Sequence, residues 1–326
     1  MNKKIVIGIV SVALLIGGGV FLKVKKGSID RQVKEQLENL NSYHVEANME
    51  MLVGDEMKTY KVDVDYLKNE TDLFKVSIYD KVLNQSQVIL RNNDGVFVCT
   101  PSLNQVYQFK SEWPFNSEKP YIYQTLLNYF NQEHEQNKKK DGIVLNSTVT
   151  YPHDETIKTQ EIRFNKNLIP EYVSVFDDSG VEKIHVEFTK FEVNQNIDIK
   201  TFEVTTQQTE TPTGSFEDYP LLPLELFGTK LASQEKCSIN GYTTHILQFT
   251  GEKSFTLVET LNDEKSDVEV VATSGELIDL VGGVAILENQ ELKFFYPGMT
   301  CSVYSDNMTQ LEMIEVVNSL QMEVLK

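Results

Sequence analysis

The sequence is poor in the residues on which most metal and redox sites depend. It has three cysteines, Cys99, Cys237 and Cys301, and five histidines in 326 residues. Three cysteines are too few for a disulfide-dense scaffold. Cys237 and Cys301 could pair within the second half of the chain, although two buried free thiols are the alternative that we favour. No histidine lies three or four residues from another histidine or cysteine, so the sequence offers no zinc motif.

The short motifs of common catalytic sites are also missing. The sequence has no GxSxG nucleophile motif, no GxxxxGK phosphate loop and no GxGxxG dinucleotide motif. Carboxylate pairs such as Asp63 with Asp65 could serve as acid and base or bind calcium, but calcium needs about six converging oxygens. In so acidic a chain, solvated strand edges and turns explain such pairs better. We therefore predict that the protein is not an enzyme and holds no metal or other cofactor.

Only one long apolar run is present, IVIGIVSVALLIGGGVFL from Ile5 to Leu22, and lysines flank it on both sides. As a helix it would cover about 27 Å, close to the roughly 30 Å hydrocarbon core of a bilayer. A cleaved signal peptide is the alternative, but no Ala-x-Ala cleavage site is present. We therefore predict a transmembrane anchor over residues 1–26, a single-pass location in the cell membrane and a body outside the cytoplasm.

Basic residues are outnumbered, since 30 Lys and Arg stand against 48 Asp and Glu, which gives a net charge of −18. The first 26 residues contribute +5 of this charge, so the remainder carries −23. A body this acidic repels nucleic acid and anionic lipid headgroups. Nucleic acid is therefore excluded as a partner.

Beyond the apolar run, the spacing of apolar residues changes from that of a helix to that of strands. Ile29, Val33, Leu37 and Leu40 lie on one face of a helix, whereas residues 45–51 alternate between apolar and polar. The alternation predicts an antiparallel sheet with one apolar and one solvated face. Its strands are predicted at 45–51, 60–66, 73–78, 87–91, 95–99, 105–109, 143–150, 159–165, 171–177 and 181–191. A helical spacing interrupts them at 121–130, and 133–142 is predicted as an exposed helix end or loop.

A polar segment, TTQQTETPTGS at 205–215, is typical of a linker. It separates a predicted first domain, 27–204, from a smaller second domain, 216–326. In the second domain we predict strands near 244–249, 254–261, 267–272, 284–287 and 291–296. A closing helix follows, because Thr309 to Glu312 form a capping box. The predicted fold class is therefore α+β, with a transmembrane helix, a sheet with covering helices, and a small α+β domain that ends in a helix.

Several motifs occur in a fixed order along the first domain. They are the turn TPSLNQ at 100–105, the element SEWP at 111–114, and the later series Pro170, Asp177, Gly180, Asn194, Asp198 and Phe202. With these motifs, residues 30–205 resemble the LolA-like outer-membrane lipoprotein carrier superfamily. The resemblance is to its branch in Gram-positive spore formers, the sporulation and germination lipoproteins of the GerS/YdcC type.

The resemblance implies a strongly curved antiparallel sheet, or half-barrel, whose helices cover an apolar hollow. Burial contributes about 0.8 kcal/mol per methylene, so one bound fatty chain would gain on the order of 10 kcal/mol before any costs. The alternative is that the same side chains are plain core. The candidate lining residues are the apolar strand positions Val45, Ala47, Met49, Met51, Phe74, Val76, Ile78, Val88, Leu90 and Phe97, together with Trp113.

Two features depart from the pattern that the resemblance implies. The branch is lipid-anchored through a cysteine, and Gly18 stands where that cysteine would be. The carriers also use an arginine to latch the lid, and the sequence does not show which of Arg31, Arg91 and Arg163 would do so. We predict a non-catalytic, membrane-anchored envelope protein that binds a lipid, lipoprotein or protein partner in sporulation or germination. The alternative is an envelope-stress sensor that restrains an anti-sigma factor.

Overall fold

The fold is mostly β, so the predicted α+β class is wrong. Strands make up 60% and helices 13% of the residues that the computed structural model describes. Few segments keep a helical spacing of apolar residues, whereas period-two alternation extends over strands of up to 12 residues. The described residues are 29–53, 56–81, 85–100, 105–115, 118–151, 155–204, 220–261, 269–280, 283–296 and 298–322.

The predicted anchor over residues 1–26 lies outside the described residues. Across the part of the chain that the structure describes, no helix is both long enough and apolar enough to cross a membrane.

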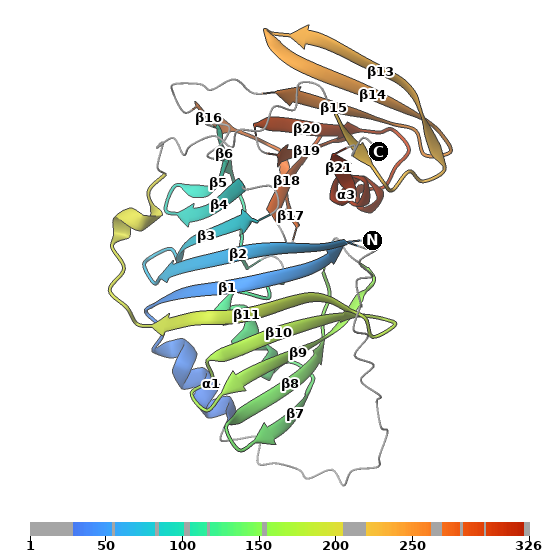
Figure 1. The fold of residues 1–326 in the computed structure, drawn as a ribbon. Coiled ribbons are helices and arrows are strands. Elements are labelled where there is room, and N and C mark those ends of the chain that lie inside the picture. The colour runs from blue at the N-terminus through green and yellow to red at the C-terminus, as the bar shows by residue number, and fades with distance from the viewer. Residues whose placement is uncertain are drawn as a thin grey trace, which may run out of the picture.

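A twelve-stranded sheet forms the larger part of the molecule (Figure 1). Its strand order is β16-β6-β5-β4-β3-β2-β1-β11-β10-β9-β8-β7, and all neighbours are antiparallel except β16 and β6. The strands are β1 (Ser42–Val53), β2 (Glu56–Leu67), β3 (Leu73–Asp80), β4 (Gln85–Asn92), β5 (Gly95–Thr100), β6 (Gln105–Phe109), β7 (His134–Lys139), β8 (Gly142–Thr148), β9 (Ile157–Asn165), β10 (Pro170–Asp177), β11 (Glu182–Val193) and β16 (Glu269–Ala272).

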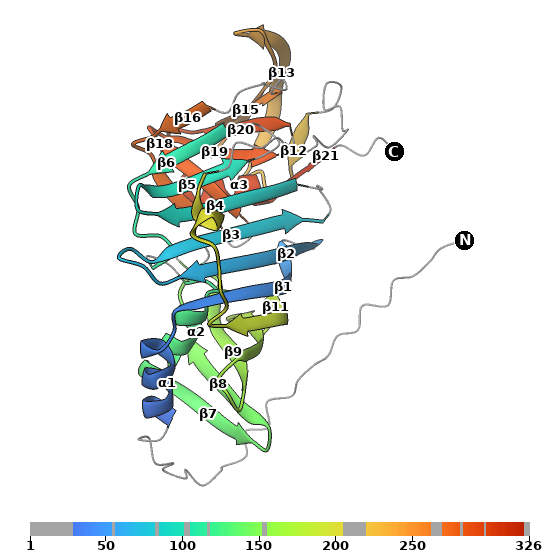
Figure 2. The same ribbon diagram turned by 90° about the vertical axis from the view of Figure 1, so that its left-hand side faces the viewer.

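Short helices cover one face of this sheet, which we call the inner face (Figure 2). They are α1 (Ile29–Glu38), α2 (Tyr123–Asn128) and the 3-10 helix η2 (Tyr129–Asn131). Their apolar side chains pack with those of the strands in one continuous cluster, the main core. On the opposite face, the 3-10 helix η3 (Ile199–Phe202) follows β11 and contacts β3 and β4.

The second half forms a seven-stranded antiparallel sheet in the order β13-β14-β15-β20-β19-β18-β17. Helix α3 (Gln310–Asn318) and the small β12–β21 sheet contribute to its core. The capping box is confirmed, because Thr309 Oγ1 accepts from Glu312 N and Glu312 Oε2 accepts from Thr309 N. Helix α3 is not the last element of the described residues, however, since β21 follows it. The strands are β12 (Leu221–Pro223), β13 (Thr229–Ile239), β14 (Tyr242–Gly251), β15 (Phe255–Leu261), β17 (Glu276–Leu280), β18 (Gly283–Glu288), β19 (Glu291–Tyr296), β20 (Met299–Tyr304) and β21 (Leu320–Met322).

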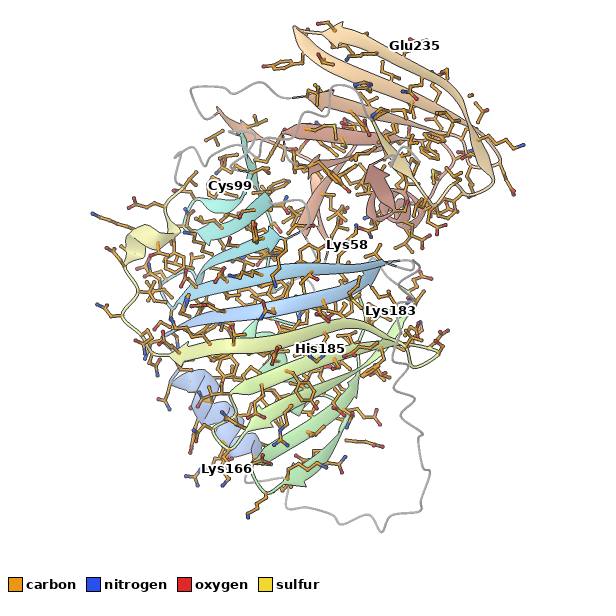
Figure 3. All side chains as sticks on the ribbon, viewed as in Figure 1. Lys58, Cys99, Lys166, Lys183, His185 and Glu235 are labelled. Carbon is orange, nitrogen blue, oxygen red and sulfur yellow. The ribbon has the colours of Figure 1, made fainter. Side chains whose placement is uncertain are left out.

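The two halves share apolar and polar contacts. Leu277, Val284 and Ile286 from the second half belong to the main core. The Gln87 side chain accepts a hydrogen bond from Val284 N at 2.7 Å. Lys58 of β2, which is labelled in Figure 3, donates from its Nζ to Asn318 O at 2.9 Å. The predicted linker at 205–215 lies outside the described residues, so the domain boundary stays a prediction.

Candidate ligand-binding site

The structure brings together eight of the eleven predicted lining residues at the inner face of the sheet, where all but Trp113 lie on strands and Trp113 lies on the segment that covers them. Seven of them are fully buried in the main core, and the eighth packs against it half-buried. The seven are Val45, Ala47, Met49, Phe74, Val76, Ile78 and Trp113, and the eighth is Met51.

The other three, Val88, Leu90 and Phe97, lie on the opposite face. They form a small separate cluster there with Cys99, Val106 and Val204, which we call the back cluster. The inner-face residues of β4 and β5 are instead Ile89, Val96 and Val98. Whether any of the eleven side chains contacts a ligand stays a prediction.

The sequence did not separate the two faces of β5, because Val96, Phe97, Val98 and Cys99 are all buried. Alternation identifies the core side of a strand only where the other side is solvated. Here the segment after β11 covers the other side, where Asn92 Nδ2 donates to Phe202 O at 3.1 Å.

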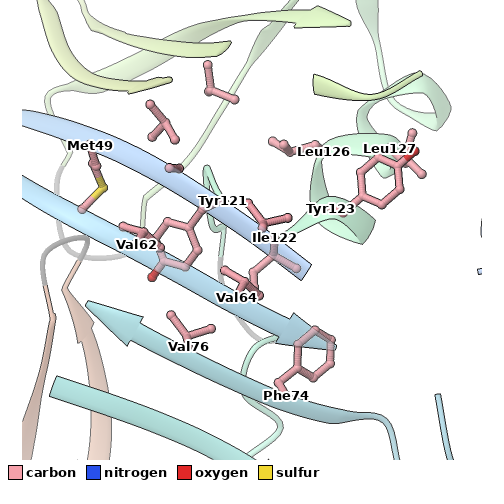
Figure 4. Close-up of a cluster of buried hydrophobic side chains, with 14 of the residues drawn as sticks. Met49, Val62, Val64, Phe74, Val76, Tyr121, Ile122, Tyr123, Leu126 and Leu127 are labelled. Atoms are coloured by element: carbon pink, nitrogen blue, oxygen red, sulfur yellow. The ribbon is translucent and has the colours of Figure 1, made fainter. Parts of the chain in front are cut away.

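The space that would be the hollow is filled by the chain itself. Residues 111–115 and 118–131, which we call the lid, place eight large side chains against the inner face, each at most 2% exposed. Figure 4 shows Tyr121 and Ile122 of the lid against Val62, Val64 and Val76 of the sheet. In this state the inner face is a packed core, as the plain-core alternative requires. The eight are Trp113, Tyr121, Ile122, Tyr123, Leu126, Leu127, Tyr129 and Phe130.

Arg91 of β4 holds the beginning of the lid. Its Nη1 donates to Trp113 O at 2.7 Å, and the guanidinium lies 5.5 Å from the ring centre of Phe115. Hydrogen bonds to charged groups contribute about 1.5–3 kcal/mol each. Sequence reasoning named three candidate arginines and did not choose among them. Only the pairing of β4 beside the lid shows that Arg91 is in this place.

Several polar atoms of the lid are buried without a hydrogen-bond partner. They include Trp113 Nε1, Tyr121 Oη and Gln124 Nε2. Burial also raises the pKa of the Tyr121 hydroxyl above its ordinary value, so the group stays protonated. Each unsatisfied buried group costs about 1–3 kcal/mol. The packed lid is therefore less stable than its apolar contacts alone would make it.

Nearby, burial lowers the pKa of Lys119 to about 7, and the side chain is 3% exposed. The neighbouring Glu118 carboxylate accepts a hydrogen bond from the Tyr129 hydroxyl. The lid thus buries polar side chains as well as apolar ones.

A small cavity of about 100 Å³ lies where the two halves meet. Met51 and Ile78 line it from the first half, and Val284 and Phe294 from the second. Pockets for drug-sized ligands are usually about 300–1,000 Å³. This cavity could hold a few waters but not an acyl chain.

Among the histidines, His185 on β11 has the neighbours most similar to those of a catalytic relay, a hydroxyl and a carboxylate. Ser174 Oγ and Glu182 Oε1 lie 3.1 and 2.8 Å from its Nδ1, and the bond to Glu182 raises the pKa of His185. A catalytic relay needs the hydroxyl and the carboxylate on different ring nitrogens, so this group does not match one.

Within the described ranges, no three His, Cys, Asp or Glu side chains are placed to hold a metal ion. Cys99, Cys237 and Cys301 are all free, with Cys99 and Cys301 buried and Cys237 half-buried.

Comparison with known proteins gives a match in sequence over most of the chain. The chain is 31% identical over 298 residues to the sporulation protein YdcC of Bacillus subtilis (strain 168), and the match covers 88% of each. The resemblance to the YdcC type of sporulation protein is thereby confirmed. No family model matches the sequence.

Similar solved structures include the Pseudomonas aeruginosa MucA/MucB complex and a LolA superfamily protein from Nitrosomonas europaea. The first has a TM-score of 0.35 and 11% identity, over 93% of this chain and 100% of the other. The second has a TM-score of 0.31 and 15% identity, over 56% of this chain and 98% of the other.

Proposed function

Because the chain belongs to the family of the sporulation protein YdcC, we propose that it is a non-catalytic binding protein of the cell envelope that acts in sporulation or germination. Its ligand is the acyl part of a lipid or lipoprotein, which binds to the inner face when the lid moves. The observation that carries the proposal is an extended apolar face covered by a separate, latched segment that leaves polar atoms unpaired.

The free energies of burial indicate how large a ligand must be to displace the lid. The eight buried lid side chains contribute roughly 2 kcal/mol each, or on the order of 16 kcal/mol together. The unpaired polar atoms reduce this by about 1–3 kcal/mol each. The three unpaired atoms of the lid leave roughly 7–13 kcal/mol, and a single fatty chain gains on the order of 10 kcal/mol, so one chain only about balances the lid. A lipid with two acyl chains exceeds it.

The location belongs to the same proposal. The apolar run Ile5–Leu22 would keep the protein at the cell membrane with its body outside the cytoplasm. Fractionation of cells supports this if the protein stays with the membranes after alkaline washing, and contradicts it if the protein is found in the cytosol.

The test uses Trp113, which is the only tryptophan in the sequence and is fully buried in the lid. The purified full chain is titrated with a two-chain phospholipid and, separately, with palmitate, while Trp113 emission is recorded. Lid displacement exposes the indole and shifts its emission to the red. We expect saturable shifts with the phospholipid at lower concentration than with palmitate, and co-purified acyl lipid by mass spectrometry.

Arg91→Gln removes the guanidinium that holds the lid, and Arg163→Gln is its matched control. Arg163 forms ion pairs with Asp141 and Glu171, neither of which belongs to the lid. Loss of the latch should raise lipid affinity by about ten- to a hundredfold, in line with about 1.5–3 kcal/mol for its hydrogen bond, whereas the control should match the wild type. The proposal fails if no lipid changes Trp113 emission and none co-purifies. A partner protein captured in place of lipid would assign the inner face to protein binding.

A further inference from the structure

The edge strand β6 is covered by a short piece of chain from the other half of the protein. Strand β16, only four residues long, runs parallel to β6 and pairs Val270 with Val106 and Val271 with Tyr107. Figures 1 and 2 both show β16 at the outer edge of the sheet beside β6. It is the one parallel pair among the strand pairs of the described residues.

Strand β16 is weakly held. Val270 is 51% exposed, Ala272 is exposed and Val271 is only half-buried, so the strand buries little apolar surface. Its attachment is mainly the backbone ladder, which continues with Thr273 N donating to Gln108 O at 3.2 Å. A four-residue parallel ladder gains little stability by itself.

Without β16, the β6 edge would be an open template. An unpaired strand edge with apolar residues recruits other strands, and proteins commonly cover or charge such edges. At the other end of the sheet, β7 (HEQNKK) is protected by exposed polar and charged side chains. β6 (QVYQF) carries no charge, so its protection depends on β16.

A cavity of about 180 Å³ adjoins β16 on the side where Val271 and Tyr107 lie. Glu288 and Glu291 give it a negative character that Lys293 offsets only in part. Glu291 pairs with Lys293 at 3.4 Å. Glu288, by contrast, accepts from the hydroxyl of Ser274 at 2.5 Å and that of Thr273 at 3.4 Å, and no cation in the described ranges pairs with it.

We propose that the β6 edge is a docking site for an extended basic peptide of a partner protein, and that β16 occupies it until the partner binds. The partner adds as a parallel strand in the place of β16. The partner carries Lys or Arg at the position where Val271 now pairs with β6. The long side chain of that Lys or Arg fills the cavity and reaches Glu288. The net charge of −18 favours the approach of a basic segment. This inference does not depend on a ligand at the inner face.

Two fluorescein-labelled peptides test the docking site on the full chain. One copies residues 269–276, EVVATSGE, with Glu269→Lys and Glu276→Lys so that the peptide is basic like the proposed partner, and the other also carries the Val271→Arg change. The pair Ala272→Cys with Gln108→Cys lies in register across β16 and β6, so oxidation locks β16 in place and reduction frees it. Gln108→Cys alone is the matched control.

We expect the arginine peptide to bind the reduced pair at least tenfold more tightly than the oxidised pair. Glu288→Gln should weaken binding of the arginine peptide about tenfold and binding of the peptide that keeps valine at this position less than twofold. Should the cysteine pair fold poorly, Val271→Arg within the chain offers a second route, since a better-fitting β16 should block the peptide and raise the melting temperature.

Equal binding to the locked and free forms, or no binding of the arginine peptide to any folded form, would overturn the proposal. So would a dimer that oxidation abolishes, because the occupant of the edge would then be the β16 strand of a second copy.

Discussion

Replacing Glu259 with glutamine should remove a strong pH dependence from the stability of this protein. Glu259 lies on β15, its side chain is fully buried, and its oxygens accept from Leu221 N at 3.0 and 3.2 Å. His245 and Cys301 are its register partners on the neighbouring strands. Burial raises the pKa of Glu259 from near 4.5 to about 8, and the bond from Leu221 offsets this only in part.

The direction in which stability changes with pH follows from the proton that Glu259 holds in the folded chain. Between about pH 4.5 and 8 the folded chain keeps a proton on Glu259 that the unfolded chain releases, so stability falls as the pH rises through this range. At 1.36 kcal/mol per pH unit, the interval corresponds to about 5 kcal/mol lost by pH 8. Glutamine keeps an oxygen for Leu221 N and has no charge to bury.

Urea unfolding of the full chain at pH 5, 7 and 9 measures the effect. The wild type and Glu259→Gln should differ by less than about 1 kcal/mol at pH 5, and the variant should be more stable by up to about 5 kcal/mol at pH 9. Glu276→Gln removes an exposed charge in the same seven-stranded sheet and should follow the wild type at every pH. Parallel stability curves for wild type and Glu259→Gln would show that the folded protein does not hold Glu259 neutral.

Two smaller changes test the packing and capping. Thr309→Ala should lower the free energy of unfolding by about 1 kcal/mol, because the N-terminal cap of α3 is lost, and Thr309→Ser should restore most of it. Met49→Ala should cost about 2–5 kcal/mol in urea unfolding, whereas Met57→Ala, at a 55% exposed position, should stay within about 0.5 kcal/mol. Equal effects at the two methionines would contradict the assignment of Met49 to the main core.

Strands with one solvated face could be predicted from the sequence. In β1, Val45, Ala47 and Met49 alternate with polar residues, and all three prove to be inner-face residues. Strand β7 was missed, because residues 133–142 were predicted as a loop or helix end. As the edge strand it buries almost nothing on either face, so its sequence, HEQNKK, has no apolar alternation to detect.

The predicted α+β class failed for a related reason. The helical segments 29–38, 123–128 and 310–318 were recognised by their spacing or cap, but they are short beside the strands that surround them. Strands such as β13, with few buried side chains, carry little signal in the sequence and raise the β content above the prediction.

The sequence by itself determined which side chains of strands such as β1 are buried, the cap of α3 and the membership of the YdcC family, because these depend on neighbouring residues and on identity along the chain. The tertiary structure decided which face Val88, Leu90 and Phe97 occupy, that the lid fills the inner face, that Arg91 holds the lid and that β16 covers β6. Each of these depends on segments far apart in the chain that meet only after folding, and local periodicity carries no record of such contacts.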